Sequence, residues 1–535
     1  MTPAFQPQSA EPGVTRANAK QYRVPLPHGL QNLSQICSHQ STHTYFRRKL
    51  IVQEEITPTP NQRYMSWPVL SLLVFITVIG FENIFYPFQN QGLSVVINWI
   101  ILLFIYIIPY ALISAQLGTT FTRADEGGGL ATWMRRTLGD SWGYWTSWIY
   151  WAQTLPYLVD VSNAVIVSLS WMILGDNTLG KRMSNLTFGL LTFAVILLFI
   201  VLENLFSRSL EVMSLLGGAA MFLMAVLFVA LTAAGLAKGM PSATHFSWAA
   251  FRPHFSMHYF ATTGLLIFAT SGAELGATYV AQLRNPKKEF PKAMWALAIM
   301  TGFLVIFGSL ALGVWFNANH LPDDLKMNGA YYAFSMLGKA WGWGKTLMYM
   351  FAATQLLFML AQLAVLIDAS SRVLSADTAA RYMPKWLLQK NRQGRPIHSY
   401  VFTAALCLFL LLLADTLPNI NAIFNWLLNL NGIVSPYKTA LVFVAFLALR
   451  AQADKFTSGY VFLKSKGAAY LVGGWCFVFT FICATLGFLP QEVVFGTNGW
   501  THQLIMNIIS VIVLFGFGFI MPVLARRDLK KDDAA

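Results

Sequence analysis

Three acids and one base lie near the middle of long apolar stretches of this sequence: Glu82, Asp160, Glu274 and Lys438. An ionised side chain costs about 3 kcal/mol at the centre of a membrane, so such residues are rare and usually functional. A buried carboxylate can receive a substrate ammonium group or carry a proton. The alternative is structural: Lys438 neutralises one acid, and the other two are buried in the neutral form.

Two of these acids stand beside glycine-containing interruptions of apolar runs. Glu82 lies in FITVIGFENIFYPFQNQGL (75–93), and Glu274 lies in FATSGAELGATYV (268–280). A helix that breaks at bilayer depth frees backbone groups, which is tolerated only where they are buried or line a cavity. Freed N–H groups suit an anion and freed carbonyls suit an ammonium group, so the breaks predict a site for a zwitterionic ligand. A close helix contact permitted by glycine is the alternative for either break alone.

The composition indicates that an integral membrane protein holds these groups. Of the 535 residues, 56% are hydrophobic and 11% are charged, and the mean hydropathy is +0.53. This is too apolar for a soluble chain of this length. About twelve apolar runs are long enough to cross the hydrocarbon layer. They lie near 67–93, 96–118, 142–174, 184–204, 209–236, 259–283, 293–316, 344–371, 399–415, 420–449, 468–489 and 503–525.

The two interrupted runs are the first and the sixth of this series, with four uninterrupted runs between them. Interruptions at corresponding positions of two halves are typical of an inverted repeat. We therefore predict an all-α integral membrane fold of about twelve transmembrane helices, arranged as a five-plus-five inverted repeat with broken first and sixth helices.

The positive charge of the chain lies mainly in alternate loops. Lys and Arg number 37 and Asp and Glu number 23, which gives a formal net charge of +14. About 29 basic residues fall on one side of the predicted membrane and about 7 on the other, which indicates topology rather than nucleic-acid binding. The more basic side is cytoplasmic by the positive-inside rule, so both termini are predicted to be cytoplasmic.

Three regions are predicted along the chain. Residues 1–65 are polar and lack the apolar core of a signal peptide, so they are predicted to be a disordered cytoplasmic tail, with Met65 as an alternative start. Residues 66–526 are predicted to form the transmembrane domain, and residues 527–535 a short cytoplasmic tail.

The segment SGAELGATYVAQLRNPKKEFPKA resembles the sixth-helix signature of the amino acid, polyamine and organocation (APC) transporter superfamily. That signature is Gly-x-Glu followed by Asn-Pro-x-x-x-x-Pro, and its positions are filled by Gly272, Glu274, Asn285, Pro286 and Pro291. The resemblance implies the inverted-repeat fold described above and transport by alternating access.

Other segments extend this resemblance over about residues 66–525. TRADEGGGLATWMRRTLGDSWGYWTSWIYW (122–151) is similar to the acidic-Gly-Gly loop and the tryptophan-rich third span of the superfamily. GFENIFYP, NQGL and IPYALISAQLG (107–118) are most similar to the glutamate/GABA antiporter branch. Two residues depart from the pattern: Glu82 stands where a glycine is usual, and Gln116 where the branch usually has Glu.

The resemblance also implies roles for individual residues. Backbone around Gly80 and Phe81 would meet a substrate carboxylate, and carbonyls near Phe268 and Ser271 would meet its amino group. Phe268 matches the aromatic residue that covers the ligand in relatives, and Glu274 matches a carboxylate linked to proton coupling or gating. The predicted substrate-binding residues are Gly80, Phe81, Glu82, Asn83, Phe268, Ser271 and Gly272; those predicted for proton coupling or gating are Glu274, Asp160 and Lys438.

Glu82 and Glu274 are expected to lie near one cavity in this fold. Two close carboxylates in a low dielectric cannot both ionise cheaply, so at least one should hold a proton near neutral pH. Sodium coupling stays open, because its carbonyl and hydroxyl ligands follow no fixed motif. His254 and His258 could supply half of a metal site, but no third ligand is near them in sequence, and no metal or other cofactor is predicted.

The leading interpretation is a secondary active transporter for amino acids or related amines, such as glutamate and GABA. It would work by antiport or with a proton as co-substrate, in the cell membrane, which in a bacterium is the inner membrane. The alternative is a membrane sensor of the same fold that binds the ligand without moving it. An enzyme is not predicted, because no cluster of catalytic residues lies at one membrane face. The predicted partners are the small-molecule substrate and the lipid bilayer, and not nucleic acid.

Overall fold

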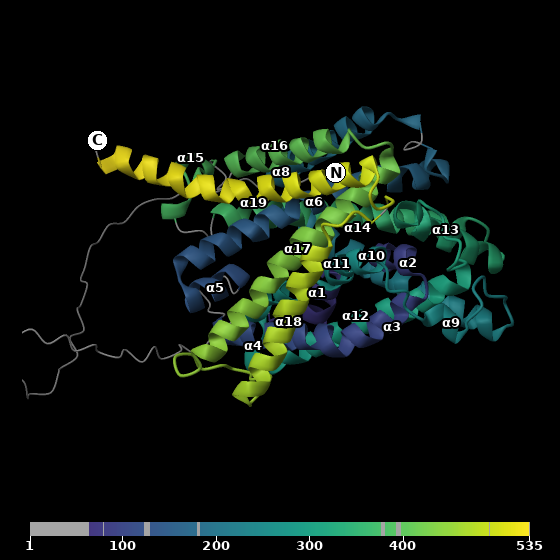
Figure 1. The fold of residues 1–535 in the computed structure, drawn as a ribbon, viewed down its shortest axis with the longest axis horizontal. Helices are drawn as coiled ribbons and strands as arrows, with labels where there is room; N and C mark the ends of the chain where they lie inside the picture. Colours follow the sequence, from purple (N-terminus) through teal and green to yellow (C-terminus); the bar gives the residue numbers. More distant parts are fainter. Residues whose placement is uncertain are drawn as a thin grey trace, which may run out of the picture. The chain divides into compact units, whose positions relative to one another are not determined.

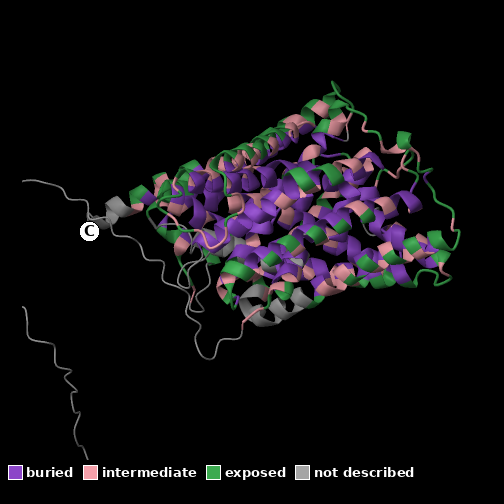
Figure 2. Ribbon diagram, turned by 90° about the horizontal axis from the view of Figure 1, so that it is seen from below, coloured by how far each residue is buried: buried purple, intermediate pink, exposed green. Residues whose placement is uncertain are grey.

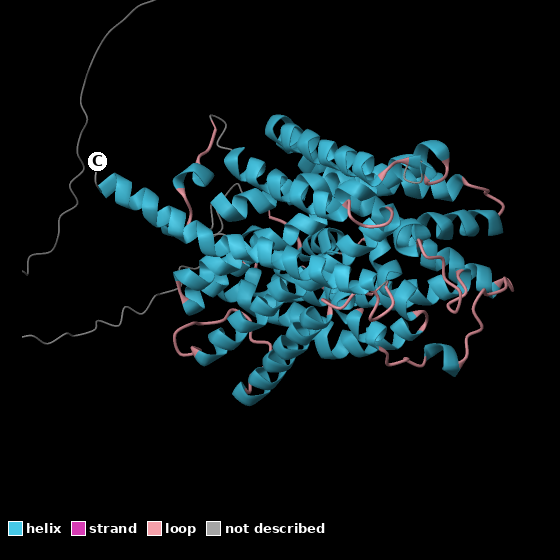
Figure 3. Ribbon diagram, turned by 45° about the horizontal axis from the view of Figure 1, so that its top comes forward, coloured by secondary structure: helices cyan, strands magenta, loops and turns pink. Residues whose placement is uncertain are grey.

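The structure is a computed structural model that describes residues 64–533 except 79, 122–128, 179–181, 376–379, 392–396 and 492. Within these residues the chain is helical apart from its loops and one isolated bridge between Met65 and Leu283 (Figure 3). The predicted all-α fold is confirmed. Of the predicted N-terminal tail, 1–65, only Tyr64 and Met65 are among the described residues.

The first half of the fold opens with a broken helix. Its parts are α1 (Trp67–Val78), the short 3-10 helix η1 (Phe81–Ile84) and α2 (Phe85–Gln91). The helices that follow are α3 (Ser94–Leu102), the π-helix η2 (Leu103–Ile107), α4 (Ile108–Phe121), α5 (Leu130–Leu138), α6 (Asp140–Leu174) and α8 (Asn185–Ala237).

The second half also contains a broken helix, made of α10 (Met257–Ala261), α11 (Thr263–Thr270) and the 3-10 helix η3 (Ala273–Gln282). The short α9 (Trp248–Phe251) precedes it. The helices that follow are α12 (Pro286–Trp315), α13 (Leu325–Ala340), α14 (Thr346–Ser375), η4 (Ala380–Tyr382), α15 (Lys385–Leu388), α16 (Ile397–Ala414), α17 (Ile420–Ala451), α18 (Lys466–Leu486) and α19 (Asn498–Asp533).

Eleven segments of the described chain are helical, long and apolar enough to cross a membrane. Two of them, Asn185–Leu202 and Leu216–Ala237, belong to α8, whose 53 residues would extend over about 80 Å as one straight helix. That length is more than twice the hydrocarbon thickness, so α8 supplies two spans. The first predicted span is not among the eleven because its break leaves α1 with 12 residues. With this broken span included, the number of spans agrees with the prediction.

Both predicted helix breaks are present. Gly80 has extended backbone (φ −85°, ψ 157°) and directly precedes η1. Gly272 separates α11 from η3 with φ 124°, a conformation that residues with a Cβ atom rarely adopt. The Ser-Gly sequence therefore allows the helix to change course beside Glu274.

The long helices α6, α14 and α17 hold the interior together. The helix α14 packs on α6 and α8, and α17 packs on α6 and on α18, beside which it runs in Figure 1. Figure 2 shows buried residues through the interior and exposed residues on the outer surfaces. Large exposed apolar side chains such as Ile299, Leu471 and Ile512 suit a surface that faces lipid.

Two elements differ from the sequence prediction. The helix α19 continues to Asp533, so the described part of the predicted C-terminal tail, 527–533, is helical. The helix α13 lies between the predicted spans 293–316 and 344–371 and was not predicted. It is too short to cross a membrane, and its residues instead cover the cavity described next.

Candidate functional site

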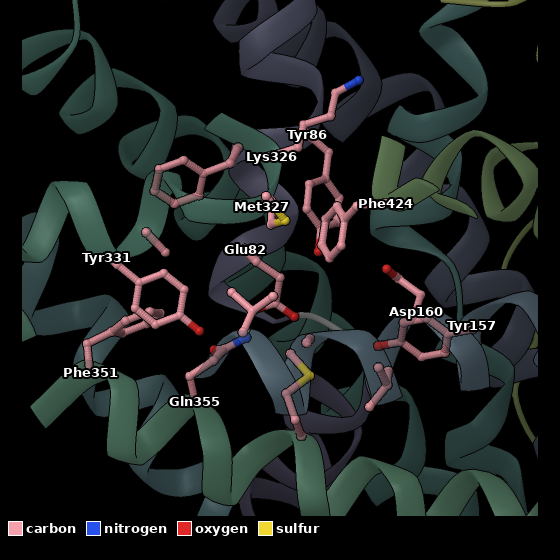
Figure 4. A pocket seen from close by; sticks show the side chains of 16 residues that line it. Glu82, Tyr86, Tyr157, Asp160, Lys326, Met327, Tyr331, Phe351, Gln355 and Phe424 are labelled. Atoms are coloured by element: carbon pink, nitrogen blue, oxygen red, sulfur yellow. The ribbon is translucent and has the colours of Figure 1, made fainter. Parts of the chain in front are cut away.

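A buried cavity lies between the broken first helix and four other helices. Its polar lining comes from η1, α2, α6, α13 and α14, and Figure 4 shows the polar ends of Glu82, Tyr86, Tyr157 and Asp160 directed toward one shared space. The residues that line it are Glu82, Phe85, Tyr86, Tyr157, Asp160, Val161, Ala164, Val167, Lys326, Met327, Ala330, Tyr331, Phe351, Gln355, Met359 and Phe424. Such a mixture of aromatic rings with a few converging polar groups is typical of a small-molecule site.

Glu82 is held at the break of the first helix. A Cβ atom added to Gly80 would overlap with the Glu82 carboxylate, which shows that this carboxylate lies directly over the Gly80 backbone. Its Oε2 accepts a hydrogen bond from Nε2 of Gln355 on α14 at 3.4 Å. The acid therefore fills the space beside the unwound backbone.

Asp160 enters the same cavity from α6. This residue is 3% exposed, and its Oδ1 has no hydrogen-bond partner within the described structure. The neighbouring Tyr157 donates its hydroxyl to Oε1 of Gln362 at 3.0 Å. A buried oxygen without a partner carries a desolvation cost, so Asp160 is available to a ligand that brings a donor.

The second buried acid site lies at the break of the sixth helix. Lys438 Nζ is 2.5 Å from Oε1 of Glu274, and the Tyr110 hydroxyl donates to Oε2 of the same carboxylate. The Tyr110 oxygen also accepts the backbone N–H of Gly272 at 2.9 Å. One tyrosine on α4 therefore connects the glycine of the break with an ion pair between η3 and α17.

A further contact fixes the other side of this break. Thr439 on α17 donates its hydroxyl to Oγ of Ser271 at 3.1 Å, and Ser271 donates to the Ile267 carbonyl at 2.7 Å. The carbonyl of Phe268 accepts the N–H of Ser271 at 3.1 Å. Adjacent residues of α17, Lys438 and Thr439, thus hold both sides of the break.

The structure changes the expected grouping of the acids. Glu82 shares its cavity with Asp160, whereas Glu274 is outside that lining and pairs with Lys438. The expectation that Glu82 and Glu274 lie near one cavity is therefore corrected. The sequence does not define how the helices are rotated and shifted relative to one another. In the structure, α6 places Asp160 opposite the first break, and the sixth helix does not place Glu274 there.

The other predicted binding residues do not line the cavity. The Phe81 ring is fully buried among aromatic rings and packs on Phe228 with centroids 5.1 Å apart. The Phe268 ring is partly buried and meets the ring of Tyr157 edge-on at 5.7 Å, so it supports a lining residue from outside. Gly80, Asn83, Ser271 and Gly272 are also outside the lining, although Gly80 contacts Glu82.

The site residues that were not predicted from the sequence include Tyr110, Tyr157 and Gln355. Gln355 is a buried amide in an apolar span, which is a signal that could have been used. The tyrosines carry no such signal, because an aromatic residue in a membrane helix is ordinary. Gln116, which departs from the branch pattern, lies elsewhere, where its Oε1 accepts the N–H of Phe462 at 3.1 Å.

The described residues contain no group of three or more His, Cys, Asp or Glu residues placed to hold a metal ion. A wider pocket adjoins the cavity and shares Met327 with it. Three aspartates, Asp323, Asp324 and Asp415, line this second pocket together with several asparagines.

Comparison with solved structures identifies the class of fold. The chain is similar to the manganese transporter of Eremococcus coleocola, solved in complex with an aromatic bis-isothiourea compound, with a TM-score of 0.51 at 13% identity. The similarity covers 87% of this chain and 95% of that one. The helical arrangement with two broken helices is thus that of a transporter fold.

The sequence comparisons define the family. The amino acid permease family matches residues 65–517, and this chain belongs to that family, within the APC superfamily. It is 37% identical to the aspartate/glutamate permease AcaP of Lactococcus lactis subsp. cremoris, over 88% of this chain and 97% of the relative. It is 27% identical to the probable agmatine/putrescine antiporter AguD of L. lactis subsp. lactis, over 71% and 78% of the two chains. The chain is therefore a multi-pass secondary transporter for amino acids or amines and not an enzyme.

Proposed function

We propose that the cavity between η1, α6, α13 and α14 is the substrate site of this transporter. The observation that carries the proposal is the pair of buried carboxylates in its lining, of which Asp160 has an oxygen without a partner. A substrate that brings donors would satisfy these groups, and the break at Gly80 would let the first helix move as the site opens to either side.

The relatives suggest two ranges of substrate. One is named for aspartate and glutamate, and another for agmatine and putrescine. Resemblance to the glutamate/GABA branch adds GABA as a third candidate, which, like aspartate and glutamate, carries both an amine and a carboxylate. All are small molecules with at least one amine, and the Glu82 and Asp160 carboxylates suit an ammonium group.

Coupling is proposed to pass through the second acid site. Glu274, Tyr110 and Lys438 join η3, α4 and α17, and the Tyr110 hydroxyl also holds Gly272 at the break. Loss or gain of a proton in this group would change the contacts that fix the sixth helix. We therefore propose exchange of substrates or proton-linked transport, in which this network opens and closes.

The location proposed is the cell membrane, with both termini in the cytoplasm, on the basis of the charge difference between alternate loops. In a bacterium this is the inner membrane.

Counterflow in proteoliposomes tests the proposed function directly. Purified protein is reconstituted with unlabelled substrate inside, and uptake of labelled glutamate, GABA, arginine or putrescine is followed at two pH values, with and without sodium. We expect saturable uptake of at least one substrate that depends on the internal substrate. Tight ligand binding without any flux would contradict transport and support the sensor alternative.

A further inference from the structure

We propose that the cavity selects organic cations that carry no carboxylate on the carbon beside the amine, such as diamines and guanidino-amines. This rests on the proposed function of the cavity as the substrate site and names the chemical class that it takes. Glu82 is the residue to which we assign this selection, with Asp160 as its partner in binding charge.

Glu82 hinders a substrate carboxylate sterically. The carboxylate of Glu82 lies over the backbone of Gly80, at the start of the unwound segment, where an added Cβ atom would overlap with it. Glu82 is 8% exposed, and its Oε2 accepts a hydrogen bond from Nε2 of Gln355. A substrate carboxylate that approached this backbone would meet the carboxylate of Glu82 in the same space.

The charged groups of the cavity also favour a cation. Its lining contains the two carboxylates of Glu82 and Asp160 and a single lysine, Lys326. Figure 4 shows the Lys326 ammonium group pointing away from both carboxylates. Two carboxylates in one low-dielectric cavity do not both ionise cheaply, but the one that is ionised opposes an added substrate carboxylate and attracts an ammonium group.

The hydrogen-bonding capacity of the lining favours a ligand that donates. Oδ1 of Asp160 and Oε1 of Gln355 are buried acceptors without a partner in the described structure. An ammonium or guanidinium group offers only donors, and therefore satisfies such acceptors, whereas a carboxylate offers only acceptors. The rings of Tyr86, Tyr157 and Phe424 in the lining suit the methylene chain of an amine and can also attract its charge.

The adjoining pocket has the same electrostatic character. Asp323, Asp324 and Asp415 line it, its lining holds no Lys or Arg among the described residues, and Met327 borders both spaces. A pocket lined by one sign of charge raises the local concentration of ligands of the opposite sign. This agrees with a cationic ligand that reaches the cavity past Met327.

Matched pairs of ligands provide the test. Putrescine and ornithine differ by one carboxylate, and so do agmatine and arginine. Binding of each to the purified full-length protein is measured by calorimetry, with glutamate as an anionic competitor. We expect the amine of each pair to bind about tenfold or more tightly than its carboxylated counterpart. Equal or tighter binding of ornithine, arginine or glutamate would overturn the proposal, as would failure of both amines to bind.

Single substitutions test whether Glu82 and Asp160 cause the selection of cations. Glu82→Gly removes the carboxylate over Gly80, so the preference for putrescine over ornithine should fall by about tenfold. Asp160→Asn should weaken both members of a pair. Asp140→Asn is the matched control, because Asp140 pairs with Arg381 at the surface, far outside the lining. An unchanged ratio of putrescine affinity to ornithine affinity in folded Glu82→Gly protein would contradict the role of Glu82. If this variant does not fold, the affinity ratios of the matched ligands for the unmodified protein decide whether the cavity selects cations.

Failure of this inference differs from failure of the proposed function. Flux of glutamate or a neutral amino acid without amine binding would refute the cation selection and leave the transporter in place. Selective amine binding without flux of any substrate would support the selection and refute transport.

Discussion

Lys438 Nζ lies 2.5 Å from Oε1 of Glu274, and the two side chains are 4% and 1% exposed. The residues come from α17 and η3, which are separated by more than 150 positions in the chain. A buried ion pair adds little stability relative to apolar residues, but loss of one partner leaves a buried charge without a counterion. Substituting one partner or both should therefore change the free energy of unfolding by clearly different amounts.

Lys438→Met should lower the free energy of unfolding by about 3–5 kcal/mol, because the buried Glu274 carboxyl group then has no cation beside it. Glu274→Gln should also destabilise, and the double variant should recover most of the loss. Thermal and denaturant unfolding of the four proteins in detergent form a double-mutant cycle. Effects of the two single changes that simply add would show that the contact carries no coupling energy.

The pH dependence of transport should depend on the same pair. Removing both charges in Glu274→Gln with Lys438→Met avoids an unpaired buried charge, and should keep exchange while flattening the pH profile of transport. Initial rates of counterflow from mildly acidic to mildly alkaline pH provide the measurement. If the double variant retains the original profile, proton coupling belongs to Glu82, Asp160 or a bound ion, and Asp160→Asn becomes the next variant.

The sequence predicted the fold and the position of both breaks, because composition and glycine placement are local signals. Ser271-Gly272 and Gly80 mark the interruptions without knowledge of any contact. The grouping of charges was not predictable in the same way. Which acid Lys438 faces depends on the rotation and depth of α17 relative to η3, and an error of one residue turns a helix by about 100°.

The role of Tyr110 could not be predicted for the same reason, because it depends on how a helix is rotated. Tyr110 and Tyr106 both lie in the second membrane span and stack with ring centroids 5.8 Å apart, yet only Tyr110 contacts Glu274. Residue type does not distinguish them, since both are buried aromatic residues with a hydroxyl. Their roles differ because the helix directs one hydroxyl to the break and the other elsewhere.

Tyr110→Phe should therefore impair transport more than Tyr106→Phe. The change removes the acceptor of the Gly272 N–H and the donor to Glu274, and an unpaired buried N–H costs about 1–3 kcal/mol. Initial rates of counterflow and melting temperatures are compared for the two variants. An equal response of both tyrosines would show that the hydroxyl of Tyr110 has no special role at the break.

Gly272 tests the break through the backbone alone. Its φ of 124° is strained for any residue with a Cβ atom, so Gly272→Ala should cost about 1–3 kcal/mol of stability and reduce transport. A larger change such as Gly272→Leu would mix this strain with filling of space. Gly516→Ala is the control, because an added Cβ atom there meets nothing within 4 Å. Normal stability and flux in Gly272→Ala would contradict a conformational need for glycine.

Membrane orientation can be tested at two exposed positions near opposite ends of α12. Lys288 lies in its first turn, and His320 follows its last residue, Trp315. The charge difference between loops predicts that Lys288 is cytoplasmic and His320 is external.

In intact cells, an impermeant thiol reagent should label His320→Cys and spare Lys288→Cys until the membrane is permeabilised. The unmodified chain is the control, because the described native cysteines, Cys407, Cys476 and Cys483, are buried. Labelling of Lys288→Cys alone in intact cells would reverse the proposed topology, and would place the acidic pocket at Asp323 on the cytoplasmic side.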